Sequence, residues 1–115
     1  PVLAAHGAAI AGAAARWVGY LSSTGVYGDT DGAWVDESAP RQGRRQGRNL
    51  ADERWAALHP GARVFRLPGI YGPGRSAIDR LRAGPPDRPV PRIDKPGHVF
   101  SRIHVDDIAA AVLAS

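Results

Sequence analysis

The sequence contains no cysteine, and this absence removes several kinds of chemistry at once. Without thiols the chain has no disulfide framework, no thiolate metal site and no cysteine nucleophile. Because disulfides belong to oxidising compartments, we expect the protein to work in the reducing cytoplasm.

Segments that would direct the chain to a membrane are also missing. The longest apolar run, residues 8–15, is interrupted by Gly12 and followed by Arg16. This is far below the roughly 20 apolar residues that a membrane span needs, so we expect no membrane partner. Neither a methionine nor a secretory signal precedes Pro1, and we therefore expect an internal fragment of a longer protein.

Positive charge is in modest excess, because the sequence has 15 basic and 11 acidic residues. A basic surface suits nucleic acid when its charge forms one face. Only part of the basic charge is clustered, at Arg41, Arg44, Arg45 and Arg48. No aromatic residue within that cluster offers a stacking platform for bases. We interpret it as a solvated loop and expect no nucleic-acid partner.

The pattern of the chain predicts an α/β fold. With 115 residues, 43% of them apolar, it fits one soluble domain or part of one. Expected helices cover residues 2–15, 50–58, 76–82 and 106–114, and expected strands cover residues 17–21, 63–67 and 99–103. This alternation is typical of a doubly wound parallel sheet, here a partial Rossmann-like one of three strands over residues 1–115. Residues 84–98, rich in proline, are expected to form an irregular excursion.

Two loops are the places where we expect chemistry. Right-handed crossovers bring the carboxyl ends of parallel strands to one edge of the sheet, where ligands bind in open sheets. The segments after the first two expected strands are residues 22–28 and residues 68–74. Proline and glycine make the second of these a predicted loop.

Four short segments stand in an order and spacing that resemble a known family. They are YLSSTGVYG at residues 20–28, DESAP at 36–40, RLPGIYGPG at 66–74 and IHVDDIA at 103–109. Together they resemble the NAD-dependent epimerase/dehydratase group of the extended short-chain dehydrogenase/reductase superfamily. The resemblance implies an oxidoreductase or epimerase that uses NAD or NADP on a small carbonyl or hydroxyl substrate. It is also compatible with a homodimer of the longer protein.

The resemblance assigns the catalytic hydroxyl to Ser23. A hydroxyl both donates and accepts, so it can hold a substrate oxygen while a proton leaves or arrives. A second interpretation stays open, in which the hydroxyls of residues 22–24 only satisfy the amides of a turn.

The resemblance also implies binding roles. The turn at residues 68–70 resembles one whose main chain meets the nicotinamide, and glycine lets the backbone approach a ring closely. The expected cofactor-binding residues are Ser22, Pro68, Gly69 and Ile70. The expected substrate-binding residues are Thr24, Tyr71 and Arg75.

Two parts of the family pattern are absent. Residues 42–53 hold neither the tyrosine that serves as general acid/base nor the lysine four residues after it, and Arg45 and Asn49 are the nearest positions. The glycine-rich loop that receives the cofactor pyrophosphate is missing as well, so we expect this chain to bind a cofactor feebly. Two classes therefore stay open, an atypical enzyme and a non-catalytic nucleotide sensor or scaffold.

A third departure concerns the substrate. Members that act on nucleotide-sugars carry an arginine four residues before the histidine of the HVDD run, and this sequence has Phe100 there, with Arg102 two places away. We expect a smaller acidic or phosphorylated substrate, with Arg75 as its anion contact. We interpret His104 as structural and the aspartates after it as helix caps, with no metal site.

Overall fold

The computed structural model describes residues 2–84, 94 and 96–115. The expected excursion at 84–98 therefore falls largely outside the described residues. The chain divides into two compact units, Pro1–Leu67 and Pro68–Ser115, and each has its own pair of strands.

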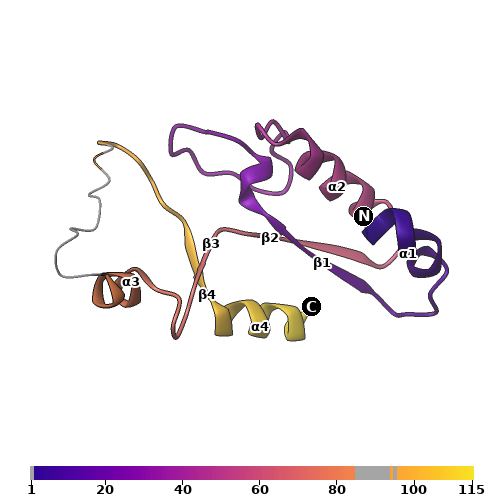
Figure 1. Cartoon of the computed structure of the whole chain (residues 1–115). Coiled ribbons are helices and arrows are strands. Elements are labelled where there is room, and N and C mark those ends of the chain that lie inside the picture. The colour runs from indigo at the N-terminus through magenta and orange to yellow at the C-terminus, as the bar shows by residue number, and fades with distance from the viewer. Residues whose placement is uncertain (1, 85–93, 95) are drawn as a thin grey trace. The chain divides into compact units, whose positions relative to one another are not determined.

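The first unit is built around two parallel strands with a helix between them in sequence (Figure 1). Its elements are α1 (Val2–Ala11), β1 (Val18–Ser23), the short 3₁₀ helix η1 (Thr24–Val26), α2 (Gln46–Ala56) and β2 (Ala62–Leu67). The β1–β2 register runs from Val18 opposite Ala62 to Ser23 opposite Leu67. This confirms the α/β class and the parallel pairing of the first two expected strands.

Aromatic and aliphatic contacts hold the first unit together. Tyr20 of β1 stacks on Trp55 of α2, with ring centroids 5.0 Å apart and planes at 7°. Val26 is fully buried, and Tyr27 and Leu67 are also buried. Because so few large apolar side chains are buried, polar contacts carry an unusual share of the packing.

The second unit has a shorter parallel pair. Its elements are β3 (Gly69–Tyr71), α3 (Ala77–Ala83), β4 (Arg102–His104) and α4 (Val105–Ala114). Gly69 stands opposite Arg102 and Tyr71 opposite His104. The hydroxyl of Ser76 accepts the Asp79 amide and the Asp79 carboxylate accepts the Ser76 amide, so a capping box starts α3 where the sequence predicts the start of a helix.

The sheet differs from the expected three strands, because the described residues form two separate two-stranded parallel sheets. Residues 68–74, predicted as a loop, contain β3. Pro68 has no N–H to continue the β2 ladder, but Ile70 and Tyr71 after it are strand formers and pair with β4.

Helix ends also differ from the predictions. The first helix stops at Ala11 and not at residue 15. Helix α2 begins four residues before the expected start at residue 50, and the side-chain amide of Asn49 donates to the carbonyl of Gly43 at 2.9 Å. Helix α4 is capped by His104, whose Nδ1 accepts the amide of Asp106, so the cap predicted at Asp106 or Asp107 is wrong.

Candidate functional site

The predicted catalytic segment lies at the carboxyl end of β1. Ser22 donates its hydroxyl to Oδ2 of Asp52 at 2.6 Å. Ser23 uses its Oγ to accept the amide of Gly25 at 3.2 Å, which caps η1, and Thr24 is the first residue of that helix. The two serines thus serve different partners, as expected for neighbours that point to opposite faces of a strand.

Asp52 is the residue that sequence reasoning missed in this unit. Its carboxylate is 0% exposed and receives a two-pronged contact from Arg66 of β2, with Nη2 2.8 Å from Oδ1 and Nε 3.1 Å from Oδ2. Arg41 approaches Oδ1 at 4.0 Å. A fork of this kind is the strongest pairing that arginine makes with a carboxylate. We call Ser22, Tyr27, Asp52 and Arg66 the Asp52 network.

The remaining guanidinium donors of Arg66 reach the turn after β1. Nη1 donates to the phenol oxygen of Tyr27 at 2.8 Å and to the Glu37 carbonyl at 3.5 Å. The network therefore joins β1, β2, α2 and the segment that follows η1.

Both members of the central pair are charged. Burial by itself raises the pKa of Asp52, but the hydrogen bonds from Arg66 and Ser22 and the positive charges of Arg66 and Arg41 outweigh it, so this pKa is lowered overall. The hydrogen bond to Asp52 raises the pKa of Arg66 against the opposing effect of burial.

We predict that Ser22→Ala destabilises the chain by about 1.5 kcal/mol, because a hydrogen bond to a buried charged group is lost while the Arg66 fork remains. Ser38→Ala is the matched control, since that exposed serine bonds only its neighbour Asp36. Urea unfolding followed by circular dichroism measures both. Equal stability of the two variants would contradict the inward role of Ser22.

A second contact holds the loop before α2 against the same turn. The Gly43 amide donates to the Val26 carbonyl at 2.8 Å, and the side chain of Asn49 bonds the Gly43 carbonyl. Among the described residues, Oδ1 of Asn49 is buried without a hydrogen-bond partner. Asn49 thus stabilises the loop before α2. It is one of the two positions, with Arg45, nearest to the tyrosine and lysine of the family that this sequence lacks.

The other predicted site residues lie in the second unit. The Gly69 amide donates to the Ser101 carbonyl at 3.1 Å, so this amide is already used by the sheet. Arg75 is exposed and closes a tight turn through its amide and the Gly72 carbonyl. Tyr71 lines a pocket of about 400 Å³.

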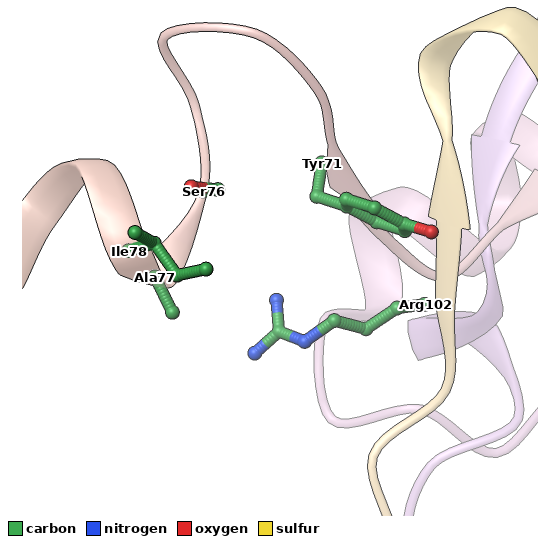
Figure 2. Close-up of a pocket in the computed structure, with 5 residues that line it drawn as sticks. All are labelled: Tyr71, Ser76, Ala77, Ile78 and Arg102. Carbon is green, nitrogen blue, oxygen red and sulfur yellow. The ribbon is translucent and has the colours of Figure 1, made fainter.

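That pocket has a different arginine from the one expected. Tyr71, Ser76, Ala77, Ile78 and Arg102 line it, whereas Arg75 is not among its lining residues (Figure 2). Arg102 is the first residue of β4 and lies two residues after Phe100, and this nearness in sequence was the available signal.

Neither a metal-binding cluster nor a membrane-spanning helix occurs in the described part of the chain. No group of three or more histidine, cysteine or acidic residues there is placed to hold a metal ion. No helix there is long and apolar enough to cross a membrane.

Comparisons with known proteins show a likeness to a solved structure. No family model and no curated protein matches the chain. Among solved structures, it is similar to a functionally unknown conserved protein from Silicibacter pomeroyi DSS, with 54% sequence identity and a TM-score of 0.85. The match covers 100% of this chain and 42% of that one, so our chain spans less than half the length of this relative.

Proposed function

We propose that the chain is the middle part of an NAD(P)-dependent oxidoreductase or epimerase of the extended short-chain dehydrogenase/reductase type. The observation that carries the proposal is the parallel β1–β2 pair, whose register ends with Ser23 opposite Leu67. The family-like segments at residues 20–28 and 66–74 therefore run across the carboxyl ends of these two strands, the position at which open parallel sheets bind ligands. The proposed full fold is a Rossmann-like doubly wound sheet to which this pair contributes two strands.

The hydrogen bonds of Ser22 and Ser23 support different roles for the two residues. Ser22 is committed to Asp52, so we assign it a bracing role in addition to its predicted place beside the cofactor. Ser23 accepts one bond from Gly25 and keeps its O–H free to donate in the described structure. That donor would hold the substrate oxygen and stabilise negative charge on it.

The fit to a nicotinamide cofactor is partial. NAD or NADP would supply or accept the hydride. The half-buried Ser23 suits a reacting oxygen, but the Gly69 amide is engaged by Ser101, so another main-chain group of residues 68–70 must meet the carboxamide. With no tyrosine in residues 42–53, the proton would pass through solvent.

A second function has its own support. Ser23 caps η1, which is a sufficient structural reason for a serine at that position. Together with the missing tyrosine, this favours a protein that binds a nucleotide without reacting, as a sensor or scaffold.

Calorimetric titration with NAD and with NADP tests the proposal on this chain and on the longer Silicibacter pomeroyi protein. We predict saturable binding by the longer protein and at least about tenfold weaker binding by this chain, which lacks the glycine-rich phosphate loop. Absence of binding by the longer protein would refute the nucleotide assignment. Tight binding by this chain would refute the expected role of the missing loop.

Hydride exchange with a panel of carbonyl compounds and sugars separates the two functions. In an active longer protein, exchanging the residue that aligns with Ser23 for alanine should lower kcat by about 10²- to 10⁴-fold. The residue that aligns with Ser38 provides the control. Cofactor binding without exchange on any member of the panel would favour the sensor.

A further inference from the structure

The pocket of the second unit combines one cation with apolar walls. Figure 2 shows the guanidinium of Arg102 extending from β4 toward Ala77 and Ile78 of α3, with the ring of Tyr71 beside it. Its volume of about 400 Å³ suits a small organic molecule.

Arg102 is available for a ligand. Among the described residues it forms no ion pair, while Arg66 and Arg41 both have carboxylate partners. Its guanidinium carbon lies 5.6 Å from the centroid of Phe100, so a cation–π contact supports the group. Within the part of the chain that the structure describes, its N–H donors have no hydrogen-bond partner. A planar fork of donors matches a carboxylate in two-pronged geometry.

The polar groups around the pocket do not compete for the guanidinium. The hydroxyl of Ser76 donates to Asp79 Oδ2 at 2.7 Å, and the Ser76 amide donates to the same oxygen at 2.9 Å. Asp79, the acid next in sequence to Ile78, is thus engaged by the capping box of α3 and does not pair with Arg102. Tyr71 packs edge-on against His104 with centroids 5.1 Å apart and remains 40% exposed.

We propose that this pocket binds a small carboxylate with a short apolar tail. Arg102 holds the carboxylate, and Tyr71 and Ile78 contact the tail. Arg75, the anion contact expected from sequence, is replaced in this role by Arg102. Calling the ligand a substrate rests on the proposed function, but binding of the carboxylate does not.

Nuclear magnetic resonance on the ¹⁵N-labelled chain provides the test, without any nucleotide present. The Nε–Hε signal of Arg102, assigned by its loss in Arg102→Gln, is followed while butyrate, inorganic phosphate or 1-butanol is added at constant ionic strength. We predict a saturable shift with butyrate, weaker binding of phosphate and no saturation with butanol. Arg102→Gln should weaken butyrate binding at least tenfold, as read from the amide of Tyr71.

Matched variants make the result specific. Arg75→Gln should leave the affinity for butyrate unchanged, and Arg102→Lys should give an intermediate loss because an ammonium lacks the fork. Ile78→Asp, at a position that is 58% exposed, should abolish binding through like-charge repulsion without disturbing the core. This variant keeps the test decisive if Arg102→Gln does not fold.

Several outcomes would overturn the proposal. They are equal butyrate affinity in Arg102→Gln or Ile78→Asp, loss of binding in Arg75→Gln, saturation by butanol, and phosphate binding tighter than butyrate binding. Failure of NAD(P) to bind the longer protein would leave this titration unaffected, so the two proposals fail separately.

Discussion

Replacing Arg66 by methionine is expected to destabilise the chain by about 3–5 kcal/mol, because it leaves a buried carboxylate without its countercharge. Asp52 is 0% exposed, and only the hydroxyl of Ser22 and the guanidinium of Arg41, 4.0 Å away, would remain near it. Native domains have only about 5–15 kcal/mol of stability, so most of it could be lost. Urea unfolding followed by tryptophan fluorescence and circular dichroism measures the change.

The double variant Asp52→Leu/Arg66→Met distinguishes the net stability of the ion pair from the cost of leaving the Asp52 carboxylate buried and unpaired. Buried ion pairs often can be replaced by apolar groups of similar volume at little cost, so this variant should recover most of the loss. Arg63→Met on the same strand is the control, since Arg63 stacks over Trp17 at 5.2 Å and balances no buried charge in the described structure. A loss in Arg66→Met no larger than in Arg63→Met would contradict a central role for the Asp52 network.

Acid unfolding reports on the same carboxylate. The pKa of Asp52 is lowered on folding, so its contribution to stability is complete above the unfolded pKa of about 3.9 and is lost as the pH falls through the lower folded value. The chain should therefore lose stability on the acid side of this range. The double variant should show a shallower loss there, because it lacks that titrating group.

The parallel β1–β2 pair was predictable because its causes are local. The strand formers at residues 17–21 and 63–67 are separated by a helical segment long enough for a parallel crossover. Strand β3 was not predictable in the same way, because Pro68 and Gly69 signal a turn and only pairing with β4 makes residues 69–71 a strand.

The candidate site was predicted where it depends on position along a strand, and missed where it depends on distant partners. Residues 22–24 do lie at the end of β1. Asp52 lies in an expected helix and nothing local marks it as buried, because its partners lie 30 residues before it and 14 after it. Arg102 was ranked behind Arg75 because it stands two places from the family position, and its place in the pocket depends on where β4 begins.

The second large effect is expected at Gly43, where alanine should cost about 3 kcal/mol through forced backbone displacement. A Cβ built on Gly43 would clash with the carbonyl oxygen of Gly25 and would lie 3.1 Å from Oδ1 of Asn49. The nearer of these atoms belongs to the backbone of η1, so it cannot move by a simple change of rotamer. Displacing it would also disturb the Ser23 cap and the bond from Gly43 to Val26.

Gly47→Ala is the matched control for Gly43→Ala, because nothing lies within 4 Å of a Cβ at Gly47 and the residue belongs to α2. Alanine in a helix is favoured over glycine, so this variant should be more stable than the parent by roughly 0.5–1 kcal/mol. Thermal and urea unfolding of both variants give the comparison. If Gly43→Ala unfolds at the same urea concentration as Gly47→Ala, the close approach of residues 25 and 43 does not occur in the folded chain. A large loss in Gly43→Ala alone places the arginine-rich loop against the turn that carries Ser23, and this contact would then account for the glycine between Gln42 and Arg44.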